Sequence, residues 1–342
     1  MLKKLKYLFC FLTFLPLFNS SLFSQSKINI SFGSCLNSKK EMGILKSIKE
    51  FSPDYFIFLG DNIYKDSLNI EDKAKEYEKL GENNDFRAIK QNSKIYATWD
   101  DHDYGINDSG EEYTAKIDSQ REFLRFFYPD KLSEKMKSKG VYSSEEINFK
   151  KLKIQLIILD TRYFRTSLLK KYYFFGPYVS NYDSEATILG KEQWIWLEDE
   201  LNKISDLTLI VSSIQFHNED HGFEKWSNFP LEKEKLFHLL KKSKKENVII
   251  LSGDRHISES FIIDGLNLKN FYEITSSPLN NELPFRVPFN KRADRVGELL
   301  YDSSFGNIEI SDKNNKYYFE FSYILKNLNK VIIPINNFII QK

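Results

Sequence analysis

The chain contains little cysteine, and this scarcity limits the ways in which it can be held together. Its 342 residues include two cysteines, Cys10 and Cys35. Cys10 lies in an N-terminal apolar run that we expect to be removed, so Cys35 would have no partner for an internal disulfide. An isolated thiol in an exported protein is either a small buried hydrophobic group or a group with a chemical use, such as binding a metal.

The chain also lacks an excess of charge of either sign and, after Ser26, any long apolar run. A formal net charge of +1 gives no indication of a nucleic-acid-binding surface. No segment after Ser26 is long and apolar enough to span a bilayer. Because internal repeats and linkers rich in proline or glycine are absent as well, one domain is favoured over two.

The N-terminus differs in composition from the rest of the chain. Lysines at the start precede a short apolar run at residues 7–18, and a stretch rich in small residues follows. This order is typical of a secretory signal peptide. We therefore predict a signal peptide at residues 1–24 and a mature domain at residues 25–342 that is periplasmic or secreted. An uncleaved membrane anchor is the alternative, because Leu22 is a poor residue three positions before the cut.

Short apolar strands alternate with amphipathic helices through most of the mature chain. The predicted strands are residues 27–32, 55–59, 94–99, 152–159, 207–212 and 247–251. The predicted helices are residues 42–51, 71–80, 111–128, 190–201 and 231–242. From residue 259 the pattern becomes rich in strands. Alternation followed by a run of strands predicts an α/β (α+β) fold in which sheets pack together with helices outside.

Side chains that can bind metals gather directly after five of the predicted strands. These segments are residues 33–35, 60–64, 99–108, 160–163 and 253–256. One aspartate after a strand is ordinarily a turn residue or a helix cap. Several carboxylates in the crevice beyond the strand ends would repel one another unless a cation compensated their charge. The repetition therefore favours a metal site, and two-metal carboxylate sites suit phosphate-ester hydrolysis.

The same segments resemble the alkaline phosphatase D (PhoD-like) family of the calcineurin-like metallophosphoesterase superfamily. The matching stretches, in family order, are FGSC (32–35), LGDNIY (59–64), TWDDHDYGIND (98–108), LDTRYFR (159–165) and LSGDRHISE (251–259). The resemblance implies a metallophosphoesterase-type two-sheet β-sandwich flanked by helices, a four-layer αββα arrangement. The strand-rich part, about residues 259–342, would complete the second sheet.

The resemblance further implies a binuclear or larger metal cluster, with Fe(3+) plus Ca(2+) as the expected ions. The implied ligands are Cys35, Asp61, Tyr64, Asp101, Asn107, Asp254 and His256. Asp61 would bridge the metals, and Cys35 and Tyr64 would bind the ferric ion. The asparagine of the family falls on Asn107, but this chain departs from the commoner pattern at Asp103 and Tyr104. Asn107, Asp101 and Asp103 therefore remain open as the ligand from the third motif.

Two further residues are candidates for direct roles in catalysis. His102 would be a general acid for the leaving alcohol, or else would support the site by packing. Arg162 would clamp phosphate oxygens through its planar guanidinium, or else would form a structural ion pair.

These features predict an exported, metal-dependent hydrolase that attacks phosphate monoesters or diesters with a metal-bound hydroxide. Its substrate would be a small phosphate ester or diester, with lipids and cell-wall polymers included. The alternative is a non-catalytic phosphate- or phospholipid-binding protein on the same fold. Such a protein would be expected to have lost ligands, whereas every motif position here carries a side chain that can bind a metal.

Overall fold

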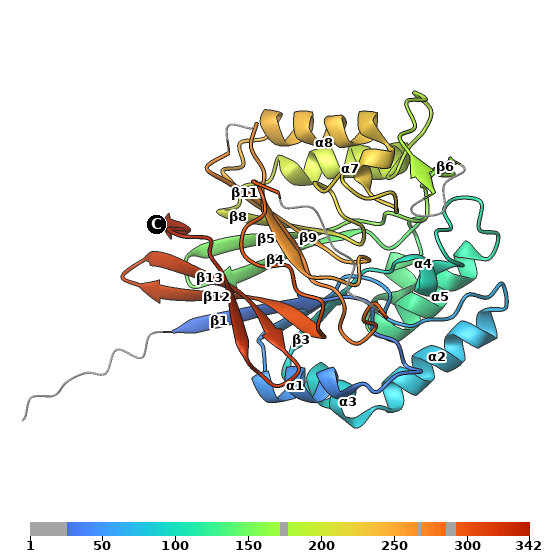
Figure 1. The fold of residues 1–342 in the computed structure, drawn as a ribbon, viewed down its shortest axis with the longest axis horizontal. Helices are drawn as coiled ribbons and strands as arrows, with labels where there is room; N and C mark the ends of the chain where they lie inside the picture. Colours follow the sequence, from blue (N-terminus) through green and yellow to red (C-terminus); the bar gives the residue numbers. More distant parts are fainter. Residues whose placement is uncertain (1–25, 172–176, 266–267, 285–291) are drawn as a thin grey trace, which may run out of the picture.

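Two β-sheets packed face to face form the centre of the protein, and helices cover both outer faces (Figure 1). The structure is a computed structural model that describes residues 26–171, 177–265, 268–284 and 292–342. The signal peptide predicted at residues 1–24 lies outside the described residues. Within the described ranges, no helix combines the length and the apolar character needed to cross a membrane.

The first sheet has the strand order β14-β13-β12-β1-β2-β3, and β15 pairs with β13. Its parallel strands are β1 (Lys27–Gly33), β2 (Tyr55–Phe58) and β3 (Lys94–Ala97). Its antiparallel strands are β12 (Ser304–Lys313), β13 (Lys316–Leu325), β14 (Lys330–Ile333) and β15 (Ile339–Gln341). The N-terminal parallel strands are thus extended by the end of the chain.

The second sheet has the strand order β10-β11-β9-β8-β5-β4. Its parallel neighbours are β5 (Leu152–Ile158), β8 (Leu207–Ser212), β9 (Asn247–Ser252) and β11 (Asn270–Thr275). Its antiparallel edges are β4 (Ser143–Phe149) and β10 (Glu259–Ile262). A separate pair consists of β6 (Leu169–Lys170) and β7 (Tyr178–Val179).

The strand-rich C-terminal part differs from the prediction that about residues 259–342 would complete the second sheet. Strands β10 and β11 join the second sheet, whereas β12 to β15 join the first. The reason is the pairing of β12 with β1, which runs antiparallel from Lys27–Ser311 to Phe32–Gly306. The C-terminal part therefore completes both sheets.

Helices form the two outer layers (Figure 1). On the first sheet these are α1 (Gly43–Phe51), α2 (Ile70–Glu82), α3 (Asn84–Asn92) and α5 (Lys116–Phe127). On the second sheet they are α7 (Gly190–Leu201) and α8 (Pro230–Lys242). The short helices are α4 (Asp101–Tyr104) and α6 (Leu132–Lys135), with 3-10 turns at Pro129–Lys131 and Trp226–Asn228.

Alternation of side chains along the strands produces three apolar layers. Phe56 and Phe58 of β2 pack against the helices on the first sheet, whereas Ile57 and Leu59 point into the space between the sheets. In β5, Ile154 and Leu156 also face that central space. A third cluster lies between the second sheet and α7 and α8. Strands with successive residues buried on opposite faces thus give the four layers.

Helix α3 and strand β4 are the longest of the elements that were not predicted from the sequence. Helix α3 follows α2 after a single residue, Asn83, whose side chain accepts hydrogen bonds from the backbone nitrogens of Asp85 and Phe86. Strand β4 is an edge strand with mostly polar residues, and of its side chains Ile147 is fully buried. The hydrophobic pattern is weak at both places because each element has a largely solvated face.

Replacing a residue in the central layer should destabilise the protein strongly. Leu156 is 0% exposed between the sheets, so Leu156→Ala should lower the free energy of unfolding by about 2–5 kcal/mol. Urea denaturation measures this change. The control is Ile204→Ala, because Ile204 is 89% exposed and should change stability by less than about 0.5 kcal/mol. Equal effects of the two substitutions would contradict the assigned central core.

Candidate metal centre

The carboxyl ends of strands from both sheets come together at one edge of the sandwich. Backbone hydrogen bonds join the segments after β1 and β2, from Cys35 N to Gly60 O at 3.2 Å and from Leu36 N to Asp61 O at 2.8 Å. Gly60 has a φ of 111°, and a Cβ at this position would lie 2.6 Å from that of Asp100. Glycine therefore permits the close approach of the β2 and β3 ends.

Four candidate ligands adopt a backbone conformation that is unusual for residues with a side chain. The φ angles are 62° at Cys35, 52° at Asp61, 67° at Asp254 and 54° at His256. All are in the left-handed region, which costs roughly 1–3 kcal/mol per residue when the surroundings impose it. Such residues cluster at functional sites, because the fold maintains the strain to direct particular side chains.

One group of donor atoms comes from three separate strand ends. Single ligand atoms of Cys35, Asp61 and His256 all lie within 4.8 Å of one another. Cys35 Sγ is 3.5 Å from Asp61 Oδ2. The Tyr64 hydroxyl lies 3.0 Å from Asp61 Oδ2 and 3.1 Å from His256 Nε2. Thiol, phenol, imidazole and carboxylate donors thus surround one small space.

A second group shares a member with the first. Ligand atoms of Asp61, Asp101 and His102 also lie within 4.8 Å of one another. The backbone nitrogen of His102, at the start of α4, is 3.0 Å from Asp101 Oδ1 and 3.4 Å from Asp61 Oδ1. The other Asp101 oxygen accepts a hydrogen bond of 2.7 Å from Asp108 N. Asp61 is therefore common to both groups.

The residues left open for the third motif differ in their contacts. Asp103 is buried, and its oxygens accept hydrogen bonds from Asp100 N and from the backbone and side chain of Asn62. Asp103 therefore fixes the loop. Asn107 is exposed, and its amide nitrogen donates to Asp108 Oδ2 at 2.7 Å, so its role as a ligand remains a prediction. Of the three, Asp101 belongs to a donor group.

The electrostatics of the site disfavour the ionised forms of most of its acidic groups. Asp101 is the exception, because burial acts to raise its pKa but His102 and Arg162 outweigh burial and lower it. Burial raises the pKa of the Cys35 thiol to about 11 and the pKa of Asp254 to about 7. Burial also raises the pKa of Asp61, with Asp101 and Cys35 as further causes, and the pKa of Tyr64. Each group would have to lose its proton to bind a metal, and a cation would supply the charge that makes this loss favourable.

His102 is held between a carboxylate and an aromatic ring. Its Nδ1 lies 2.6 Å from Asp66 Oδ1, and its ring centroid is 4.4 Å from that of Tyr64. Burial acts to lower the pKa of His102, but Asp101 and Asp61 oppose it, and the pKa rises to about 10. The Nδ1 contact with Asp66 fixes the orientation of the ring.

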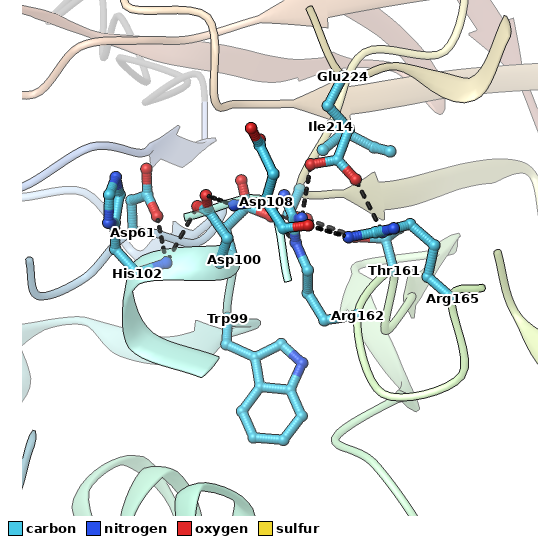
Figure 2. A network of polar contacts seen from close by, with 12 residues as sticks. Asp61, Trp99, Asp100, His102, Asp108, Thr161, Arg162, Arg165, Ile214 and Glu224 are labelled. Carbon is cyan, nitrogen blue, oxygen red and sulfur yellow. Dashed lines mark hydrogen bonds and ion pairs between the residues drawn. The ribbon is translucent and has the colours of Figure 1, made fainter. Parts of the chain in front are cut away.

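Arg162 was predicted as a phosphate clamp, but the structure places it in a buried ion-pair network (Figure 2). Its side chain is 0% exposed, with Nε 2.6 Å from Asp100 Oδ1 and a terminal nitrogen 2.5 Å from Glu224 Oε2. Glu224 also pairs with Arg165 Nε at 2.8 Å. Burial raises the pKa of Glu224, and the two guanidinium groups oppose that rise. Arg162 thus has the alternative role considered for it, that of a structural ion pair.

Several supporting residues were missed from the sequence. The Ser277 hydroxyl donates to Cys35 Sγ at 3.2 Å and accepts from His256 N at 2.9 Å, so it links two strand ends. Its position directly after a predicted strand is the signal that marked the other segments. The buried ammonium of Lys73 donates to the carbonyls of Lys65, His102 and Gly105, and no sequence signal separates it from the other lysines of its helix.

A family model and a curated relative that match this chain both belong to the same kind of phosphatase. The family model described as PhoD-like phosphatase matches residues 136–316. Alkaline phosphatase D from Bacillus subtilis (strain 168) is 21% identical over 254 residues, which cover 68% of this chain and 42% of that relative. This chain therefore spans about two fifths of the length of that curated relative.

Two solved structures have a similar fold. The structure of PhoD has a TM-score of 0.66 at 16% identity, with 90% of this chain and 68% of that chain covered. A dimetal phosphatase from Danio rerio has a TM-score of 0.53 at 11% identity, with coverages of 90% and 98%. These likenesses concern the fold, and they confirm the predicted mixed α/β sandwich flanked by helices.

Removing the carboxylate between the two buried arginines should destabilise the protein. Glu224→Gln leaves Arg162 and Arg165 short of a negative partner, so the free energy of unfolding should fall by about 3–5 kcal/mol. Chemical denaturation measures the loss. Asp118→Asn, which breaks an exposed pair with Arg121, is the control and should cost at most about 1 kcal/mol. A loss no larger than that of the control would contradict a structural role for this network.

Proposed function

Because this chain belongs to the PhoD-like phosphatase family, we propose that it is an exported, metal-dependent phosphoesterase. The observation that supports this function best is the pair of donor groups that share Asp61. A carboxylate has two oxygens, so one aspartate can contact two cations at once. Two cations held a few ångströms apart are the arrangement that hydrolytic enzymes use on phosphate esters.

The donor types fit two different cations. We assign Cys35, Tyr64 and His256 with Asp61 to the first cation, which we propose to be Fe(3+), because thiolate, phenolate and imidazole suit a transition metal. We assign Asp101 and the amide oxygen of Asn107, with the second oxygen of Asp61, to a Ca(2+) ion, because calcium takes oxygen ligands. Asp254 follows β9 beside His256 and would complete the cluster.

The cations would supply positive charge to the phosphoryl oxygens and would lower the pKa of a water molecule, so that it becomes a nucleophile at neutral pH. His102 lies beside both Asp61 and Asp101. We assign it as the proton donor to the leaving-group oxygen. Asp66 would position the ring through the 2.6 Å contact to Nδ1, which leaves Nε2 for proton transfer.

Substrates of this site would be phosphate monoesters or diesters. Export would bring the enzyme to small esters outside the cell, to phospholipids and to cell-wall polymers that contain phosphodiesters. The N-terminal residues 1–24 have the composition of a signal peptide, which supports a periplasmic or secreted location. A non-catalytic phosphate- or phospholipid-binding protein on this fold is the alternative that an assay must separate.

Asp61→Asn should abolish both metal binding and turnover. The protein as purified is assayed with an aryl phosphate monoester and an aryl phosphate diester, and its metal content is measured by elemental analysis. We expect Asp61→Asn to lose more than about 100-fold in turnover together with bound metal, because both cations depend on this carboxylate. The control Asp199→Asn changes an exposed aspartate on α7 and should retain metal and activity.

The same assay separates the alternatives. Bound metal with turnover that a chelator removes supports the phosphoesterase. Protein that binds inorganic phosphate but hydrolyses neither ester would instead support the non-catalytic alternative. Full metal content in Asp61→Asn would contradict the shared-ligand assignment even if hydrolysis were observed.

A further inference from the structure

Arg255 differs from the other buried arginines, Arg162 and Arg165, because its guanidinium forms no ion pair with a described residue. It lies after β9 between Asp254 and His256, and its side chain is 8% exposed. Among the described residues, its guanidinium makes no ion pair and no hydrogen bond, and its Nε is a buried donor without an acceptor. Arg162 and Arg165, which are also buried, both contact Glu224. Buried polar groups without partners are rare and call for an explanation.

The contact that holds Arg255 is an aromatic ring. The guanidinium carbon lies 5.0 Å from the centroid of Phe223, a distance typical of a cation–π contact. Phe223 is 46% exposed, so the pair lies at the surface of the site. The loop that carries Phe223 is fixed, because Lys225 Nζ donates to Phe223 O at 3.1 Å and Glu224 is bound by two arginines. The ring is therefore a preorganised support for one face of the guanidinium.

Apart from Asp254, which is a candidate metal ligand, the carboxylates on neighbouring elements are bound to other groups. Glu259 pairs with Arg295 at 2.9 Å and also accepts hydrogen bonds from Gln215 and Asn218. On the loop that carries Phe223, Glu219 pairs with Lys233 and Asp220 pairs with Arg292. None of these three carboxylates therefore pairs with the guanidinium of Arg255.

The position of Arg255 in the chain places it beside the candidate metal centre. Its two neighbours, Asp254 and His256, are proposed members of the metal cluster. His256 lies in the donor group with Cys35 and Asp61, and its Nε2 is 3.1 Å from the Tyr64 hydroxyl. An unpaired positive charge at the edge of that cluster lowers the stability of the fold. Proteins tolerate such destabilising groups mainly at active sites.

We propose that Arg255, supported by Phe223, binds the non-bridging oxygens of the phosphoryl group in this site. The inference rests on the proposed function, since it assigns the residue that receives the substrate's negative charge. The planar guanidinium presents parallel N–H donors that match two oxygens of a phosphate. Arg162, which the sequence suggested for this task, already forms ion pairs with Asp100 and Glu224.

The test measures the affinity of the full mature protein for inorganic phosphate by calorimetry. Arg255→Gln should weaken binding by about 10- to 100-fold, because a charge-assisted pair of hydrogen bonds is lost. Arg255→Lys should restore part of the affinity, since the charge remains while the fork is absent. Arg292→Gln is the matched control, because this arginine also stacks on a ring, Phe261, but is paired with Asp220 and Asp294.

Two readouts independent of turnover accompany the affinity. Metal content should be unchanged in both Arg255 variants. Phosphate should raise the unfolding midpoint of the wild type, and this rise should be reduced in Arg255→Gln. In the absence of phosphate, the midpoint of Arg255→Gln should be no lower than that of the wild type, since an unpaired buried charge has been removed. A purely structural arginine would give a lower midpoint.

A phosphate affinity of Arg255→Gln within about twofold of the wild type would overturn the inference. If Arg255→Gln loses metal, Arg255→Lys with full metal content decides, and unchanged affinity in that variant overturns the inference as well. Wild-type hydrolysis together with unchanged affinity in the variants would remove the role of Arg255 and leave the proposed function standing. Wild-type protein without metal or turnover, but with phosphate binding that depends on Arg255, would contradict the proposed function alone.

Discussion

Acidic donors crowded into one buried space are the constraint on which the rest of the structure depends. Asp61, Asp101 and Cys35 follow different strands, and Asp61 lies within a few ångströms of both Cys35 and Asp101. Burial and repulsion from neighbouring negative groups make the ionised forms of Asp61 and Cys35 unfavourable, and the backbones of both residues adopt left-handed conformations. A cation bound by these groups would neutralise their negative charges. Their close approach would then favour binding of the cation.

Ion pairs and hydrogen bonds of buried basic residues surround these candidate ligands. Arg162 joins Asp100, which precedes the α4 donors, to Glu224 of the loop after β8. Lys73 uses its three donors on the carbonyls of Lys65, His102 and Gly105, and so fixes the segment that contains His102. These contacts cross between distant parts of the chain. They hold the candidate metal ligands in place without occupying the space between those ligands.

The sequence was sufficient to predict the layered architecture, because alternating burial and strand-end motifs are local patterns. It placed Cys35, Asp61 and His256 in one crevice for the same reason. It left Arg162 open between a phosphate clamp and a structural ion pair, because residue type does not reveal which carboxylate a guanidinium meets in the folded chain. Likewise, the sequence does not show that Arg255 lacks a hydrogen-bond partner among the described residues, because such a property depends on the folded structure.

The central claim is that separate strand ends share cations through Asp61, and anomalous X-ray scattering from crystals of the purified protein tests it most directly. The account predicts one anomalous peak, at the iron edge, within bonding distance of Cys35 Sγ, Tyr64 Oη and His256. A second cation should lie on the Asp101 side of Asp61. An active preparation with no cation density among these side chains, or with its metals bound elsewhere, would contradict the account.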